Sequence, residues 1–349
     1  MSSLTLFGRT VSASDPTLVI AEIGVNHDGS LERAMELVEH AYRARADAVK
    51  LQIFRARTLM HSSTSFATYQ LDRCAEATAT EMLEHYELSA EALEEVVEAI
   101  RDRNMLPIAT PFSIDDLKLI EELRLPAVKI ASPDLVNRPL LERAARLRKP
   151  LLVSTGASTP AEIERTVGWL REWEAPFALL HCVSAYPTPQ RDANLCWVTE
   201  LAARYGAVAG YSDHTTELMS GALAVAAGAN VIEKHLTYDR RAKGPDHAAS
   251  FDPAQFAQYV HLIRQAEQLR GTPGRRVLTI EEDVRKVSRQ SLVLKRALNP
   301  GDSLREDDLV IQRPGTGIQA AELPRVVGRK LAQPLAAGTL LTWDMLHAA

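Results

Sequence analysis

Short apolar runs alternate with amphipathic segments along the first 270 residues of the chain. The apolar runs have the length of buried strands and lie at residues 17–24, 47–54, 106–110, 127–132, 150–155, 177–183, 207–213 and 230–236. Between and after them, apolar residues recur at helical spacing over residues 31–45, 89–104, 113–123, 138–147, 160–173, 194–204, 216–228 and 253–270. Residues suited to capping a helix precede several of these segments, namely Ser30, Ser89, Ser113, Asn137 and Asp252. The pattern predicts eight consecutive strand–helix units.

Strands that are apolar at nearly every position are typical of a parallel sheet covered on both faces. Eight strand–helix units in roughly 255 residues match a closed (β/α)8 TIM barrel, whose usual size is about 250 residues. An open, doubly wound sheet is the structural alternative. Segment 55–88 is longer than an ordinary strand-to-helix loop, and we expect it to pack over the mouth of the barrel.

The pattern changes after about residue 275. Short β-like runs there are divided by Pro-Gly, Gly-Thr and Asn-Pro signals, which are typical of turns. We therefore predict a barrel domain over residues 1–275, a linker over 276–286 and a small β-rich domain over 287–349.

Composition and charge exclude several classes of protein. The chain has 349 residues, of which 46% are hydrophobic and 24% charged, with a net charge of −5. No block of like charge suggests binding to nucleic acid or to a membrane surface. The N-terminus lacks the pattern of a secretory signal, and no apolar run approaches the length of a membrane span. Cys74, Cys182 and Cys196 form no disulfide framework, so we expect a cytoplasmic protein.

Polar residues gather where the predicted strands end. Barrels of this type carry their active sites at the carboxyl ends of the strands. The residues at or just beyond those ends are Glu22, Asn26, His27, Lys50, Gln52, Thr110, Lys129, Ser132, Ser154, Thr155, His181, Ser184, Ser212, Asp213, His214, Glu233 and His235. Because the eight strands converge on one mouth, we expect these residues to form a single site.

The histidines and lysines suggest two kinds of chemistry. His214 and His235 end adjacent strands and could bind a divalent transition metal, although paired histidines are often structural. Glu22, Glu233 or Asp246 could supply oxygen ligands or orient a metal-bound water. Lys50 and Lys129 lie in strands where lysine is rare, and could hold an anionic substrate or form a Schiff base. Ser132, Ser154 and Ser212 carry short hydroxyls suited to a phosphate or carboxylate.

A set of motifs in fixed order resembles the sialic acid synthase family. The motifs are AEIGVNHDGS, AVKLQ, ATPF, VKIAS, LVSTG, LLHCVSAYPTP, GYSDHT, EKHLT and GPDHAAS. The later stretches QRPGTGI and VVGRKLAQPLAAGTLL resemble its SAF domain, a β-clip or antifreeze-like fold. The resemblance covers about residues 17 to 346. The family includes N-acetylneuraminate synthases, legionaminate synthases and the spore-coat polysaccharide protein E type.

The resemblance implies a reaction and its cofactor. Phosphoenolpyruvate would condense with the open-chain aldehyde of an N-acetylmannosamine-type sugar, releasing phosphate and leaving a nine-carbon 2-keto acid. A legionaminate-type synthase acting on a 2,4-diacetamido sugar is the alternative within the family. His214 and His235 match the ligands of a divalent metal, usually Mn²⁺, with Mg²⁺ or Co²⁺ as alternatives.

The resemblance also assigns roles to individual residues. The positions that match a phosphoenolpyruvate site are Lys50, Thr110, Lys129, Ser132, Ser154, Ser184 and Ser212. The positions that match the sugar site are Gln52, Tyr186, Asp246 and Arg313. Glu22 or Asp134 would help water to add, and Lys50 and Lys129 would balance the substrate's charge. Arg313 matches an arginine that the SAF domain of a partner subunit places over the barrel mouth, which implies a domain-swapped homodimer.

The chain departs from the family pattern at three places. It has Ser-Pro-Asp at 132–134 where many relatives have Ser-Gly-Glu, which puts the role of Asp134 and the choice of acceptor in question. Ser184 stands where many relatives have Asn, and segment 61–82 lacks the stretch expected for an N-acetylneuraminate synthase. A Schiff-base aldolase and a non-catalytic sugar-binding homologue are the competing functions.

Overall fold

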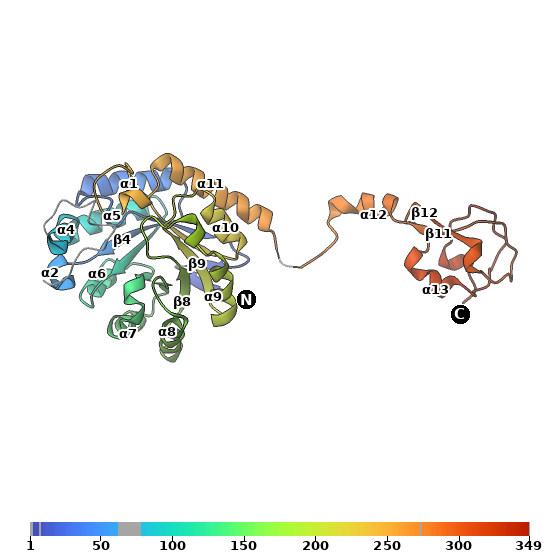
Figure 1. The fold of residues 1–349 in the computed structure, drawn as a ribbon, viewed down its shortest axis with the longest axis horizontal. Helices are drawn as coiled ribbons and strands as arrows, with labels where there is room; N and C mark the ends of the chain where they lie inside the picture. Colours follow the sequence, from blue (N-terminus) through green and yellow to red (C-terminus); the bar gives the residue numbers. More distant parts are fainter. Residues whose placement is uncertain (1–2, 7, 62–77, 273, 349) are drawn as a thin grey trace. The chain divides into compact units, whose positions relative to one another are not determined.

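The computed structural model describes residues 3–6, 8–61, 78–272 and 274–348. The chain divides into two compact units, Met1–Thr272 and Pro273–Ala349 (Figure 1). No helix among the described residues is both long and apolar enough to cross a membrane.

The first unit is a closed barrel of eight parallel strands. In order around the barrel these are β3 (Leu18–Glu22), β4 (Ala48–Ile53), β5 (Leu106–Pro111), β6 (Val128–Ile130), β7 (Leu151–Ser154), β8 (Phe177–His181), β9 (Val208–Asp213) and β10 (Val231–His235). Because β10 pairs with β3, the sheet closes, and the open doubly wound alternative is wrong. The strands predicted from the apolar runs are all present and in order.

Helices surround the barrel on its outer face. They are α1 (Leu31–Arg43), α5 (Ala90–Asp102), α6 (Asp116–Glu122), α7 (Arg138–Arg146), α8 (Pro160–Glu172), α9 (Cys196–Tyr205), α10 (Ser220–Ala226) and α11 (Pro253–Arg270). Ser30, Ser89, Asn137 and Asp252 cap their helices through side-chain oxygens, as predicted. Ser113 is not the cap of α6, which begins at Asp116, but its hydroxyl accepts a hydrogen bond from the Asp116 amide.

The segment between β4 and α5 holds two short helices, α2 (Ala56–Leu59) and α4 (Ala79–His85). Leu59, Met82 and Leu83 from these helices line a cavity at the barrel mouth, as expected for this segment. Residues 62–77, with most of the unusual stretch 61–82, lie outside the described residues.

An N-terminal hairpin that the sequence pattern did not predict closes the opposite end of the barrel. Strands β1 (Ser3–Leu6) and β2 (Arg9–Ser12) pair antiparallel. Their inward side chains Leu4, Leu6 and Val11 pack with residues from the strand starts, including Leu18 and Val231. The chain therefore fills the bottom of the barrel with apolar groups and leaves the polar mouth at the other end.

The second unit is small and β-rich. It contains α12 (Glu282–Ser288), β11 (Ser291–Leu294), the antiparallel β12 (Leu309–Gln312) and α13 (Leu323–Val326). A separate core, rich in leucine, includes Leu292, Leu304, Leu331 and Leu341. The predicted linker 276–286 includes the first residues of α12, so it is partly helical.

Candidate active site

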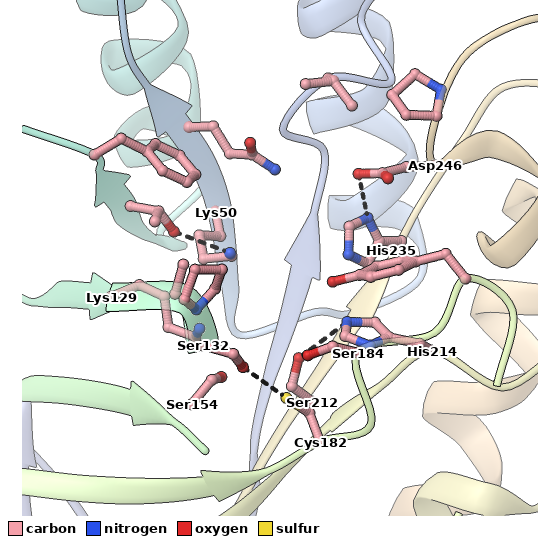
Figure 2. A pocket seen from close by; sticks show the side chains of 18 of the residues that line it. Lys50, Lys129, Ser132, Ser154, Cys182, Ser184, Ser212, His214, His235 and Asp246 are labelled. Atoms are coloured by element: carbon pink, nitrogen blue, oxygen red, sulfur yellow. Dashed lines mark hydrogen bonds and ion pairs between the residues drawn. The ribbon is translucent and has the colours of Figure 1, made fainter. Parts of the chain in front are cut away.

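A cavity lies where the barrel strands end. Its volume is about 340 Å³, within the range of small-molecule sites. The lining residues are Val25, Lys50, Gln52, Phe54, Leu59, Met82, Leu83, Thr110, Phe112, Lys129, Ala131, Ser132, Pro133, Ser154, Cys182, Ser184, Tyr186, Ser212, His214, Glu233, His235, Pro245 and Asp246. Figure 2 shows the lysines, Ser132 and Ser154 on one side and His214, His235 and Asp246 on the other.

Two lysines and two glutamates form a buried charge network at the base of the cavity. The Lys50 ammonium lies 2.7 Å from a Glu22 carboxylate oxygen and 3.5 Å from one of Glu233. Lys129 lies 4.0 Å from the same Glu233 oxygen. Strand register explains these contacts, because Glu22 is paired with Lys50 across β3 and β4. Lys50 also donates to the Thr110 hydroxyl at 3.1 Å.

Burial and charge shift these four groups in different directions. Burial raises the pKa of Glu22, although Lys50 opposes the shift. Burial also works against ionised Glu233, but Lys129, Lys50 and the Ser212 hydroxyl outweigh it and lower its pKa. Burial lowers the pKa of Lys129, while the nearby glutamates prevail over burial and raise the pKa of Lys50. An anion that enters the cavity would be a second negative partner for Lys129 and would offset the cost of burying its charge.

Three hydroxyl groups line the cavity near the ends of strands β6, β7 and β9, namely those of Ser132, Ser154 and Ser212. The Ser212 hydroxyl donates to Glu233 at 2.9 Å, and the Ser132 hydroxyl accepts from the Gly156 amide at 3.0 Å. The Ser154 hydroxyl is buried and has no hydrogen-bond partner among the described residues. Such a group is costly unless a ligand or water satisfies it, so Ser154 marks where a polar ligand would bind.

Gly156 keeps this side of the cavity open. A Cβ atom at this position would come within 2.8 Å of the side chains of Ser132, Cys182 and Ser184. The glycine therefore lets the backbone of the β7–α8 turn approach the hydroxyl groups closely. The helix that follows, α8, begins four residues later with a complete capping box at Thr159.

His214 and His235 face each other across the other side of the cavity, with ring centroids 5.5 Å apart. His214 Nδ1 lies 2.8 Å from the carbonyl oxygen of Val183 and donates to it as a neutral ring, which leaves Nε2 as the lone-pair nitrogen. His235 Nδ1 lies 3.5 Å from a carboxylate oxygen of Asp246. The Tyr186 ring packs against both histidines, with its centroid 4.0 Å from that of His214.

The histidine pair fits a divalent metal held partly by small-molecule oxygens. Burial lowers the pKa of His214 to about 4 and that of His235 well below its usual value, so both rings are neutral near pH 7. Neutral imidazole is the form that binds metal. No group of three or more His, Cys, Asp or Glu among the described residues has the arrangement of a metal site. Two protein nitrogens would therefore leave the remaining positions for substrate and water.

Most residues predicted for the site come together in this cavity, but Glu22, Asp134 and Arg313 do not line it. The strand-end residues Asn26, His27, Thr155, His181 and Asp213, expected in the same site, do not line it either. Glu22 lies just beneath the lining and touches it through Lys50 and Gln52, which donates to Glu22 at 3.2 Å. Asp134 does not line the cavity, and its carboxylate accepts from the Asn137 side chain at 2.9 Å. Arg313 belongs to the second unit, so its place over a barrel mouth stays a prediction.

Two features of the site were missed or underrated in the sequence. The sequence suggests Glu233 as an oxygen ligand or as a group that orients a metal-bound water, whereas in the structure its carboxylate lies close to both lysines. Its position two residues before His235 on β10 could have indicated the same inward direction. The second feature is an apolar wall formed by Val25, Phe54, Leu59, Met82, Leu83 and Phe112. Its residues come from the ends of three strands and from the helices α2 and α4, so no local pattern reveals it.

Comparison with known proteins establishes the family. The model of the NeuB family matches residues 37–274, and that of the SAF domain matches residues 289–347. The chain is 37% identical to the N,N'-diacetyllegionaminic acid synthase of Legionella pneumophila, over 95% of this chain and 94% of that protein. It is 35% identical to the synthase of the same name from Campylobacter jejuni, over 90% and 95%.

Solved structures agree with this assignment. The N-acetylneuraminic acid synthetase of Leptospira borgpetersenii superposes with a TM-score of 0.75 at 31% identity, covering 81% of this chain and 95% of that one. A putative spore coat polysaccharide biosynthesis protein E from Chromobacterium violaceum gives 0.83 at 26% identity, covering 95% and 100%. The fold and site are those of a carbon–carbon bond-forming transferase. The chain belongs to the NeuB family and carries a SAF domain, which confirms the resemblance inferred from its motifs.

Proposed function

We propose that this protein condenses phosphoenolpyruvate with the open-chain aldehyde of an acetamido sugar to make a nonulosonic acid. The observation that carries the proposal is the division of the cavity into two halves. One half holds two buried lysines, a row of hydroxyls and the unpartnered Ser154, which suit a phosphate and a carboxylate. The other holds two neutral histidines, which suit a cation next to an aldehyde oxygen.

The residues of the chain have distinct roles in this reaction. Lys50 and Lys129 hold the negative charges of phosphoenolpyruvate, and Ser132, Ser154 and Ser212 fix its orientation. The enol carbon of phosphoenolpyruvate forms a bond to the aldehyde carbon, whose oxygen takes a proton. Water then adds to the phosphate-bearing carbon and gives up a proton to a carboxylate. As the carbon–oxygen bond to phosphate breaks, the new hydroxyl on that carbon gives its proton to the departing phosphate, which leaves inorganic phosphate and the 2-keto acid. The proton given to the carboxylate balances the one taken by the aldehyde oxygen.

The proton acceptor is a carboxylate close to the lysines. Glu22 fits this role through its direct contact with Lys50, and burial raises the pKa of its carboxyl group, which makes it a better proton acceptor. Asp134 is the other candidate, and neither carboxylate lines the cavity itself. We favour Glu22 because it contacts Lys50 and Gln52, which do line the cavity, whereas Asp134 accepts from Asn137. A divalent cation held by His214 and His235, Mn²⁺ first and Mg²⁺ or Co²⁺ as alternatives, would supply a Lewis acid for the aldehyde oxygen.

The acceptor that we favour is a 2,4-diacetamido-2,4,6-trideoxyhexose rather than N-acetylmannosamine or its 6-phosphate. The apolar wall suits the methyl group of a 6-deoxy sugar and acetamido methyls. Among the described lining residues the lysines are Lys50 and Lys129, and both lie at the phosphoenolpyruvate end, away from a sugar 6-phosphate. The two relatives named above for N,N'-diacetyllegionaminic acid support the same choice.

The assembly that we propose is a homodimer in which each SAF domain covers the barrel of its partner, with Arg313 over the sugar. The match to the SAF domain over residues 289–347 supports the domain that this arrangement needs. We place the protein in the cytoplasm. Cys182 and Cys196, the cysteines among the described residues, are unpaired, as a reducing compartment favours.

The decisive test is phosphate release from phosphoenolpyruvate with Mn²⁺ and a panel of acceptors, with product masses read from the same samples. The panel contains N-acetylmannosamine, its 6-phosphate, 2,4-diacetamido-2,4,6-trideoxymannose, the corresponding altrose and arabinose 5-phosphate. We expect release with the diacetamido trideoxymannose and loss of release with a chelator. Faster release with N-acetylmannosamine would overturn the acceptor assignment, and no release with any sugar would favour a non-catalytic homologue.

A further inference from the structure

Lys234 is a fully buried lysine that the proposed reaction does not use. It lies on β10 between Glu233 and His235, with no exposed surface. Successive side chains of a strand point to opposite faces, so Lys234 points away from the cavity that its two neighbours line. Its ammonium group instead meets Asp213, whose carboxylate accepts from Ser220 of α10 and Tyr259 of α11. Lys234 therefore lies between the barrel wall and the helices.

The three N–H groups of Lys234 are directed at backbone carbonyl oxygens. They donate to the carbonyl of Asp213 at 3.2 Å, to that of Thr215 at a shorter distance, and to that of Ala249 at 3.4 Å. The Asp213 carboxylate is farther away, at 3.7 Å. The ring of Phe251 covers the ammonium with its centroid 4.2 Å away. The atoms closest to the ammonium group are thus backbone carbonyl oxygens of two separate segments, rather than a carboxylate oxygen.

These carbonyls belong to the two segments that carry the histidine site. Asp213 and Thr215 are the residues immediately before and after His214. Ala249 ends the short helix His247–Ala249, which directly follows Asp246, whose carboxylate faces His235. One ammonium group therefore holds the backbone on both sides of one histidine and the loop that orients the other. Without it, the carbonyl oxygens of Asp213, Thr215 and Ala249 would lose this donor.

We propose that Lys234 is a positioning residue that sets the geometry of the His214–His235 pair by holding these two backbone segments together. The expected effect of Lys234 on metal binding and turnover rests on the proposed function. Its expected effect on the order of the two backbone segments does not. Lys234 therefore supports the site from the outer face of the barrel strands, without lining the cavity.

The test compares two variants that each remove one partner of Asp213. Lys234→Met keeps an unbranched side chain as far as Cε but removes the ammonium group and its hydrogen bonds. Tyr259→Phe removes the donor that lies 2.8 Å from the Asp213 carboxylate and leaves the three carbonyls untouched. Should Lys234→Met fail to fold, Lys234→Gln is used, because it keeps an N–H₂ donor on a neutral side chain.

The first readout is hydrogen exchange in the metal-free full-length protein. We expect faster exchange in peptides covering residues 213–217 and 246–251 of Lys234→Met, and exchange like that of the wild type in Tyr259→Phe. Unchanged exchange in Lys234→Met would overturn the proposal. Equal acceleration in both variants would also overturn it, because the effect would then come through the Asp213 carboxylate.

The second readout is Mn²⁺ affinity, measured by titration calorimetry or by electron paramagnetic resonance, together with kcat and KM. Residues that orient metal ligands typically change affinity by about 10- to 100-fold when removed. We expect a loss of that order for Lys234→Met, lower kcat, and a KM for phosphoenolpyruvate within about two-fold of the wild type. A lower melting temperature with unchanged Mn²⁺ affinity would reduce Lys234 to a structural role. A wild type that binds no Mn²⁺ and releases no phosphate would instead refute the proposed function, and hydrogen exchange would still decide the role of Lys234.

Discussion

The hydroxyl of Ser154 is the clearest single-residue sign of a bound anion. It lies at the end of β7, is 2% exposed, and has no hydrogen-bond partner among the described residues. A buried donor without a partner destabilises the folded protein, unless a ligand accepts its hydrogen bond. The Ser154 hydroxyl thus adds little to the stability of the empty barrel, and its main contribution is to ligand binding.

We expect Ser154→Ala to raise the KM for phosphoenolpyruvate by about 10- to 100-fold, the equivalent of one hydrogen bond to a charged group, with little loss of thermal stability. Steady-state kinetics and a melting curve measure the two effects. Ser158→Ala is the matched control, because its hydroxyl donates to the Gly156 carbonyl and does not line the cavity. An unchanged KM in Ser154→Ala would contradict the proposed anion contact.

Gly156 shows the limit of residue-level inference from sequence. The sequence STGAST at 154–159 is a Ser/Thr-Gly turn at the start of a helix, which is a favourable place for an anion, but such turns also occur for purely structural reasons. The reason for this glycine is the crowding by Ser132, Cys182 and Ser184, whose side chains come from three other positions in the chain.

At the scale of elements, the two ends of the barrel have different roles: one end contributes to stability and the other holds the candidate active site. The hairpin β1–β2 fills the bottom with Leu4, Leu6 and Val11, while the chemistry lies at the other end of the strands. The hairpin has only four residues in each strand, which is too short for a clear periodic pattern in the sequence.

Leu6→Ala should therefore weaken folding without changing the reaction. Leu6 is 1% exposed, and a buried leucine truncated to alanine costs about 2–5 kcal/mol. We expect denaturant unfolding to show a loss of that size, and kcat and KM at 25 °C to stay within about two-fold. Thr5→Ala, an exposed change on the same strand, should change neither quantity. A large fall in kcat for the folded Leu6→Ala protein would show that the bottom of the barrel is coupled to the site.

His27, in the turn between β3 and α1, should make the stability of the protein depend on pH. Burial lowers the pKa of His27 from 6.5 to about 4, although Asp28 opposes the shift, and His27 Nδ1 accepts from the Gly29 amide. The unfolded chain binds a proton at this residue below pH 6.5, whereas the folded chain does so only near pH 4. The contribution is fully present above pH 6.5 and is lost as the pH falls to 4, by about 3 kcal/mol.

His27→Gln keeps an acceptor for Gly29 and removes the titration. We expect the free energy of unfolding, measured by denaturant between pH 7 and 4.5, to fall less steeply in the variant than in the wild type. Other buried histidines, including His181, give a slope in the same direction, so the difference between the two proteins is the quantity to compare. Identical slopes would refute the assignment of His27 as a buried neutral group.

At the scale of the whole molecule, the proposed homodimer requires the second unit to reach the active site of a partner chain. It has its own core of leucines and matches the SAF domain. Arg313 lies just after β12 in this unit and carries the proposed contact to the sugar of a partner's barrel.

Mixing two inactive variants tests this swap. His235→Ala disables the barrel of its own chain, and Arg313→Ala disables the SAF domain of its own chain. In a mixed dimer, one site would combine an intact barrel with an intact Arg313, so we expect the mixture to regain about a quarter of wild-type activity if subunits exchange at random. Mass spectrometry of the native mixture confirms that mixed dimers form. If they form without any recovery, the swapped arrangement is wrong.

The sequence by itself determined the order of strands and helices, the position of polar residues at strand ends and the family. These properties depend on local periodicity and on motifs that are continuous in the chain. The tertiary structure decided the pairing of Lys50 with Glu22, the place of Glu233 between two lysines, the apolar wall and the contacts of Lys234. It also placed Asp134 outside the cavity lining. Each of these depends on strand register and side-chain direction between residues far apart in the chain, which only closure of the barrel fixes.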